Sequence, residues 1–111
     1  MDEPHWLMKD EVVLASLETA GGRMARARGL LGRDSLDGVL VLPNTRSVHS
    51  FGMRFTIDLA ICDPDLRVRR TLTLRPGRIT RPELAATTII EAPQGALELW
   101  GVRPGDQLAL R

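Results

Sequence analysis

The stretch Phe55-Thr56-Ile57-Asp58-Leu59-Ala60-Ile61-Cys62 decides the fold class. Large apolar side chains stand at every second position from Phe55 to Ile61, and in an extended strand such positions share one face. The turn residues Asp63-Pro64-Asp65 follow, and the alternation then resumes at Leu66, Val68, Leu72 and Leu74. These two segments predict a β-hairpin, with a bulge where Arg70 interrupts the pattern.

Further short apolar segments flank this hairpin on both sides. Residues 39–42 form a continuous apolar run, as in a strand buried on both faces, and residues 12–17, 87–91, 96–100 and 107–110 are also expected to be strands. Residues 23–31 contain good helix formers and predict a helix, whereas residues 75–87 predict a long loop. The fold class is therefore expected to be mainly β, at the border with α+β. We expect a small single-domain β-sandwich or partly closed barrel of about six to seven strands with one short helix.

The length and composition predict a single domain and argue against several classes of function. The chain has 111 residues, 43% hydrophobic and 26% charged, so residues 1–111 are expected to form one β-rich domain. The net charge of +1 gives no overall attraction to nucleic acid or to an anionic membrane, and we expect neither as a partner. Cys62 is the only cysteine, which excludes an internal disulfide, and the two histidines lack the spacing of metal ligands. We therefore expect no metal and no other cofactor.

The N-terminal residues carry no basic segment followed by an apolar stretch, and no window reaches the roughly eighteen apolar residues that span a bilayer. We therefore expect a soluble cytoplasmic protein, which we take to be a monomer.

Arginines are concentrated in residues 66–82, a segment with a net charge of +6 that contains Arg67, Arg69, Arg70, Arg75, Arg78 and Arg81. Guanidinium groups bind phosphate or carboxylate in a fixed geometry, so these side chains could line an anion site. The alternative is a solvated face, because strand alternation would divide the arginines between two faces.

The densest polar cluster is Ser47-Val48-His49-Ser50-Phe51-Gly52-Met53-Arg54, directly before the alternating strand. With a period of two, Arg54, Thr56 and Asp58 would share the face opposite the large apolar side chains. We predict that these polar residues edge a site for a small polar or anionic ligand, for example a saccharide. Asp58 also has a structural explanation, because a carboxylate in a hydrophobic strand needs a partner, and Arg54 or Arg28 could form an ion pair with it.

Two other hypotheses of function remain open. In an enzyme, His49 and Asp58 would perform acid–base chemistry and Arg54 would stabilise a developing negative charge. A hydrolytic pair of His49 and Ser50 is disfavoured, because neighbouring residues on a strand point apart and neither lies in a Gly-x-Ser-x-Gly elbow. In a protein-interaction module, an exposed apolar patch or an unpaired edge strand would bind the partner.

Two motifs, Arg26-Ala27-Arg28-Gly29-Leu30-Leu31-Gly32-Arg33 and His49 to Asp58, resemble the uncharacterised prokaryotic family called domain of unknown function 192. The resemblance covers residues 12–110, so residues 1–11 are expected to be an N-terminal extension or edge segment. The resemblance implies a compact β-rich fold with one short helix. It also implies that Glu98 and Gly105-Asp106 belong to motifs of the family further along the chain. It implies no particular activity. The ligand-binding residues that we predict are Arg28, His49, Ser50, Met53, Arg54, Asp58 and Glu98.

Overall fold

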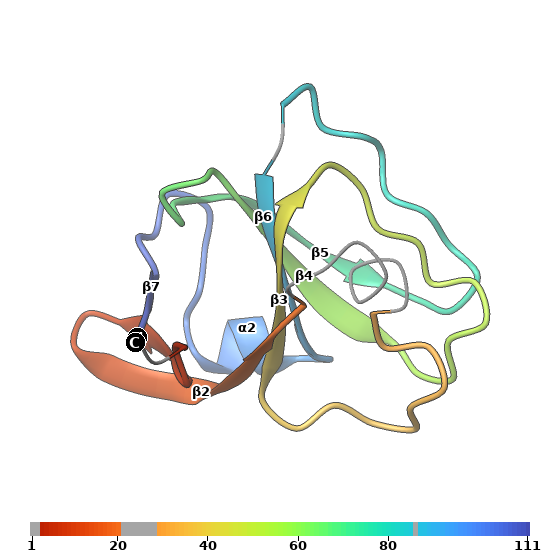
Figure 1. Cartoon of the computed structure of the whole chain (residues 1–111), viewed down its shortest axis with the longest axis horizontal. Helices are drawn as coiled ribbons and strands as arrows, with labels where there is room; N and C mark the ends of the chain where they lie inside the picture. Colours follow the sequence, from red (N-terminus) through yellow and green to blue (C-terminus); the bar gives the residue numbers. More distant parts are fainter. Residues whose placement is uncertain (1–2, 21–28, 86) are drawn as a thin grey trace.

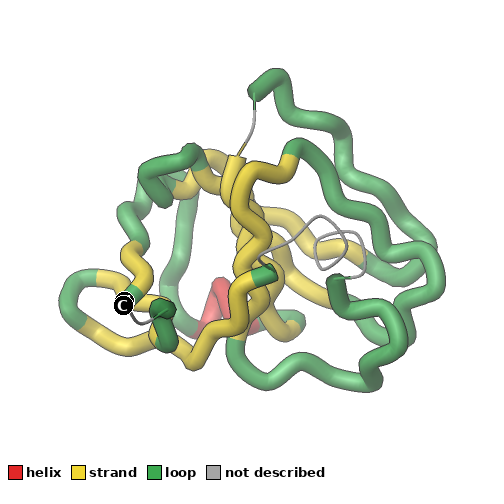
Figure 2. Tube along the Cα trace, in the orientation of Figure 1, coloured by secondary structure: helices red, strands yellow, loops and turns green. Residues whose placement is uncertain are grey.

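A seven-stranded sheet that curls into a half-barrel organises the computed structural model, which describes residues 3–20, 29–85 and 87–111 (Figure 1). The described elements in chain order are β1 (Trp6–Lys9), β2 (Val12–Thr19), β3 (Val39–Thr45), β4 (Ile57–Cys62), β5 (Val68–Leu74), β6 (Thr87–Pro93), α2 (Ala96–Leu99) and β7 (Ala109–Leu110). The strand order across the sheet is β5-β4-β6-β3-β2-β1-β7, and Figure 2 shows how much of the chain lies in loops between these strands.

The sheet is antiparallel except where β2 pairs with β3, and its two ends approach each other. An isolated bridge joins Arg67, just before β5, to Gln107, just before β7. The amide of Val68 donates to the carbonyl of Asp106 at 2.8 Å, and the amide of Leu108 donates to the carbonyl of Leu66 at 3.0 Å. These bonds link the beginning of β5 to the segment that leads into β7, so the curled sheet is partly closed.

Apolar side chains fill both faces of the three central strands β4, β6 and β3. Every residue of β4 is buried. Ala60 and Cys62 belong to a core cluster on one face of the sheet. Ile57, Leu59 and Ile61 belong to a second cluster on the other face. We call these faces the inner and outer face. The inner cluster also contains Leu97 of α2, and the outer cluster is covered by the long loops.

The predicted fold class is confirmed: the described residues form a mainly β domain with seven strands and one short helix. The strands expected around residues 12–17, 39–42, 87–91 and 107–110 are present with shifted ends. The hairpin is also present, and its register shifts between the pairs Ile61–Arg70 and Cys62–Val68, which places the expected bulge beside Arg70.

The prediction of a strand at residues 96–100 is wrong, because Ala96–Leu99 is helix α2. Leu97 and Leu99 mimic strand alternation in so short a segment, but the structure buries the consecutive residues Ala96 and Leu97 and leaves Leu99 82% exposed. Strand β1 was not predicted. Of the helix expected at residues 23–31, residues 23–28 lie outside the described residues, and Gly29 and Leu30 belong to a turn.

Candidate functional site

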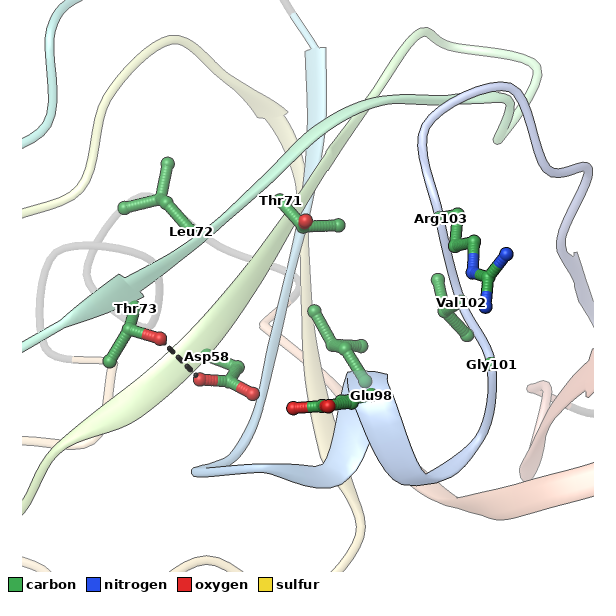
Figure 3. Close-up of a pocket in the computed structure, with 9 residues that line it drawn as sticks. Asp58, Thr71, Leu72, Thr73, Glu98, Gly101, Val102 and Arg103 are labelled. Carbon is green, nitrogen blue, oxygen red and sulfur yellow. Dashed lines mark hydrogen bonds between the residues drawn. The ribbon is translucent and has the colours of Figure 1, made fainter.

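A hollow opens on the inner face of the sheet, between the β4–β5 hairpin and the segment formed by α2 and the loop after it (Figure 3). Its volume is about 350 Å³, which is in the size range of small-molecule sites. We call it the Asp58 cleft, and its lining residues are Asp58, Thr71, Leu72, Thr73, Leu97, Glu98, Gly101, Val102 and Arg103.

Asp58 is held in place on the wall of the cleft by two hydrogen bonds. The residue lies in the middle of the buried strand β4 and is only 7% exposed. Thr73, directly opposite on β5, donates its hydroxyl to Oδ1 at 3.0 Å, and the amide of Gly95 donates to Oδ2 at 2.8 Å. Gly95 has a φ of 84°, a conformation that glycine adopts without steric cost, and it begins α2 there. Each carboxylate oxygen keeps capacity to accept a further hydrogen bond.

Helix α2 forms the opposite wall of the cleft. One side of the helix packs in the inner core, and the other side is exposed to the cleft. Leu97 is 4% exposed and packs in the inner core, whereas Glu98 is exposed and faces the cleft. In Figure 3 the carboxylates of Asp58 and Glu98 point toward each other across the hollow. The amide of Val102 donates to the carbonyl of Leu97 at 2.8 Å, which folds the following loop back onto the helix.

The loop at residues 101–106 is fixed by Lys9 of β1. The Lys9 ammonium donates to the carbonyl of Gly101 at 2.7 Å and forms a salt bridge with Asp106 at 2.9 Å. Two hydrogen bonds lower the pKa of the Asp106 carboxyl. The bond from the Lys9 ammonium has the larger effect, and the bond from the Arg103 amide has the smaller one. The loop wall of the cleft is therefore preformed.

The cleft combines polar hydrogen-bonding groups with apolar side chains. The lining includes two carboxylates, those of Asp58 and Glu98, and one guanidinium group, that of Arg103, so it carries a net negative charge. The described part of the chain holds no group of three or more histidine, cysteine, aspartate or glutamate side chains that could bind a metal ion. The two carboxylates of the lining can accept hydrogen bonds from a ligand.

Among the predicted site residues that the structure describes, Asp58 and Glu98 line the cleft, whereas His49, Ser50, Met53 and Arg54 do not. Met53 is buried in the outer core with Val48, so the loop that carries His49 and Ser50 lies on the outer face of the sheet, opposite the cleft. His49 is exposed and Ser50 is fully buried. Arg28 lies outside the described residues.

Of the two ion-pair partners expected for Asp58, Arg54 is wrong, and Arg28 lies outside the described residues. The guanidinium group of Arg54 binds Asp34 at 2.7 Å, at an exposed position. The period of two does not extend from Asp58 back to Arg54, because β4 begins at Ile57. The arrangement of His49, Arg54 and Asp58 that the enzyme hypothesis requires does not form either, because the loop that carries His49 lies on the outer face and Arg54 binds Asp34.

Sequence reasoning missed the other lining residues from β5, α2 and the loop after it, namely Thr71, Leu72, Thr73, Leu97, Gly101, Val102 and Arg103. A hairpin turn confined to residues 63–65 would place Arg70 opposite Asp58. The longer connection and the bulge place Thr73 there instead. The alternation of Thr71 and Thr73 with leucines indicated two threonines on one face, but the register depends on the bulge.

Comparison with known proteins places the chain in a family. Residues 6–110 match the model of the family DUF192, described as an uncharacterised ACR family. The chain belongs to this family. Similar members include a UPF0127 protein of Pyrococcus abyssi, 34% identical over 97 residues that cover 83% of each chain, and one of Pyrococcus horikoshii, 39% identical over 74 residues that cover 63% of this chain and 64% of that one.

Two solved structures share the fold of this DUF192 protein. A protein of unknown function from Novosphingobium aromaticivorans superposes with a TM-score of 0.73 and 17% identity, covering 86% of this chain and 74% of that one. A putative transcription regulator from Sinorhizobium meliloti superposes with a TM-score of 0.77 and 20% identity, covering 95% and 90% of the two chains. Among the described residues of the DUF192 chain, no helix has the length and apolar character needed to cross a bilayer.

Proposed function

We propose that this chain is a binding module for a small neutral hydroxylated molecule of the saccharide class, and that the Asp58 cleft is its site. The observation that carries the proposal is the environment of Asp58. A carboxylate that is almost fully buried, fixed by Thr73 and Gly95, and still lines an open hollow is preorganised to accept hydrogen bonds from a ligand.

Hydroxyl groups are the donors that best fit this cleft. Carboxylates accept hydrogen bonds from hydroxyls at two oxygens, and such charge-assisted bonds are stronger than neutral ones. Glu98 offers a second carboxylate across the hollow. A sugar ring also has an apolar C–H surface, and Leu97 and Val102 supply apolar contacts within the same lining.

The charge of the lining favours a neutral ligand over an anionic one. A ligand carboxylate or phosphate would meet Asp58 and Glu98, with only Arg103 to offset the repulsion. We therefore propose a neutral polar ligand and not an anionic one. The hypothesis of acid–base catalysis by His49 and Asp58 has no comparable support, because the two residues lie on opposite faces of the sheet.

Isothermal titration calorimetry with a panel of neutral monosaccharides and disaccharides, and of the corresponding uronic acids, tests the proposal. We expect saturable binding of a neutral sugar and at least about ten-fold weaker binding of its uronic acid, because the carboxylate of the uronic acid is repelled by Asp58 and Glu98. Glu98→Gln removes the negative charge of this acceptor and is expected to weaken binding of the neutral sugar by about ten-fold, the factor that corresponds to one charge-assisted hydrogen bond. The side chain is exposed, so the replacement leaves the fold intact.

Asp34→Asn is the matched control, because this exposed carboxylate lies outside the cleft and pairs with Arg54. Its affinity should equal that of the wild type. Absence of saturable binding across the whole panel would contradict the proposal, and so would equal affinities for Glu98→Gln and Asp34→Asn.

A further inference from the structure

Two loops on the outer face of the sheet are joined into one fixed unit. They are residues 46–56, before β4, and residues 75–82, after β5. The amide of Ser50 donates to the carbonyl of Arg78 at 2.8 Å, the amide of Gly77 donates to the carbonyl of Ser50 at 2.9 Å, and the amide of Thr80 donates to the carbonyl of Val48 at 2.8 Å. The buried hydroxyl of Ser50 also accepts the amide of Arg78 at 2.9 Å. The surface of these loops is therefore preformed.

This unit exposes two large apolar side chains, each of them beside His49. Phe51 is 53% exposed and Ile79 is 63% exposed. They are connected through His49, which pairs with Ile79 in an isolated β-bridge and stacks on the ring of Phe51 with centroids 5.2 Å apart. Single exposed apolar residues are common on protein surfaces, but two that flank the same side chain on fixed loops are an unusual concentration that a binding partner would cover.

The same unit carries a concentrated positive charge. Neither loop contains an aspartate or glutamate. Arg46, Arg75, Arg78 and Arg81 are exposed, and within the described ranges they form no salt bridge, whereas Arg54 is paired with Asp34. The net charge of the whole chain conceals this local excess, because acidic residues elsewhere balance it.

We propose that this surface, which we call the Phe51–Ile79 face, docks on a membrane that contains anionic phospholipids. The side chains of Phe51 and Ile79 enter the interfacial region, and the four arginines bind lipid phosphate groups. Arginine suits this task because its guanidinium group binds phosphate in a bidentate geometry. The two loops run along one end of the molecule (Figure 1), so a flat surface reaches both.

A lipid interface fits these observations better than nucleic acid or an acidic protein does. Membrane binding requires apolar side chains and cations on the same surface, and it requires no pocket of matching shape. Phe51 offers a ring on which a base could stack, but Ile79, the most exposed apolar residue of the unit, offers none, whereas both side chains can enter a lipid interface. The face lies opposite the Asp58 cleft, so docking leaves that cleft open and does not depend on its function.

Co-sedimentation with lipid vesicles tests this proposal. We expect the chain to bind vesicles of phosphatidylcholine and phosphatidylglycerol in equal parts at low salt, and not vesicles of phosphatidylcholine alone. Each arginine near an anionic membrane raises the partition coefficient between membrane and water by a factor of about five. The double variant Arg75→Ser with Arg78→Ser should therefore lower this coefficient about 25-fold. Phe51→Ser with Ile79→Ser should lower it at least about ten-fold.

Matched controls lie away from the face. Val12→Ser removes an apolar side chain that is 58% exposed on β2, and Arg111→Ser removes a cation whose side chain is 61% exposed. Both should bind like the wild type, and thermal melts of all variants should confirm that they fold. The proposal is overturned if the wild type does not bind the anionic vesicles, or if the controls lose binding as the face variants do. It is also overturned if the face variants lose affinity for a single-stranded oligonucleotide but not for vesicles.

Discussion

Replacement of Glu91 by glutamine is expected to stabilise the protein at neutral pH. Glu91 lies in the middle of β6, is 2% exposed, and stands opposite Leu40 on β3 and Leu59 on β4. Its Oε2 has no hydrogen-bond partner among the described residues. Burial raises the pKa of the Glu91 carboxyl from its ordinary value of 4.5 to about 7, although the positive charge of Arg33 opposes this shift.

The sign of the effect follows from this raised pKa. The folded protein binds the Glu91 proton more tightly than the unfolded chain does, so the contribution of Glu91 to stability is fully present below pH 4.5 and is lost as the pH rises to about 7. At about 1.4 kcal/mol per pKa unit, the loss is about 3 kcal/mol. Glu91→Gln keeps the shape and cannot ionise. The variant should therefore be about 3 kcal/mol more stable than the wild type at pH 8 and nearly equal to it at pH 4.5.

Urea unfolding curves of both proteins between pH 4.5 and 8 measure this difference. The difference between the two proteins isolates Glu91, because other titrating groups such as Glu18 and Asp106, whose pKa values are lowered, contribute equally to both. Asp34→Asn serves as the control, because its carboxylate is 82% exposed, and its difference from the wild type should not grow above pH 5. A stability difference for Glu91→Gln that stays constant over this pH range would show that the pKa of the Glu91 carboxyl is not raised in the folded protein.

Three further predictions concern single residues. Asp58→Asn should lower the free energy of unfolding by about 1.5–3 kcal/mol in urea melts, the range for hydrogen bonds to a charged group, and a loss under about 0.5 kcal/mol would contradict the bonding described for Asp58. Burial raises the pKa of the Cys62 thiol to about 12, so the native protein at pH 8 should react with Ellman's reagent only as fast as it unfolds, and rapid labelling would contradict this. Gly38→Ala should destabilise the protein by more than about 3 kcal/mol, because the new Cβ would overlap the carbonyl oxygen of Ser16. Gly77→Ala, at a similar φ in open space, should cost only about 1–2 kcal/mol, and equal losses for the two variants in urea melts would show that the overlap is relieved.

Strands with strong apolar patterns could be predicted from the sequence, because burial on a sheet leaves a local signal. The run at residues 39–42 and the alternation at residues 55–62 correspond to β3 and β4. The elements that were missed leave a weaker signal. Strand β1 has only four residues, and α2 is a single turn whose two leucines suggested alternation. Elements this short are determined by the packing around them.

The candidate site could be predicted only in part, because it is built from segments far apart in the chain. Asp58 was identified as a carboxylate out of place in an apolar strand, and Glu98 through the resemblance to the family. The threonine opposite Asp58 depends on the bulge and could not be assigned. The polar residues before β4 were assigned to the same site because they are close in sequence, but the sheet separates them from the cleft. Closeness in sequence does not show on which face of a sheet a loop lies.

A titration followed by ¹H–¹⁵N NMR tests most directly whether the Asp58 cleft is the binding site. The amide of Gly95 reports on Oδ2 of Asp58, and the amide of Phe51, which donates to Nδ1 of His49 at 3.3 Å, reports on the opposite face. With a neutral saccharide, we predict saturable shifts at Gly95, Thr73 and Glu98 and none at Phe51. Shifts confined to the loop around Phe51, or no saturable shift with any sugar of the panel, would contradict the account.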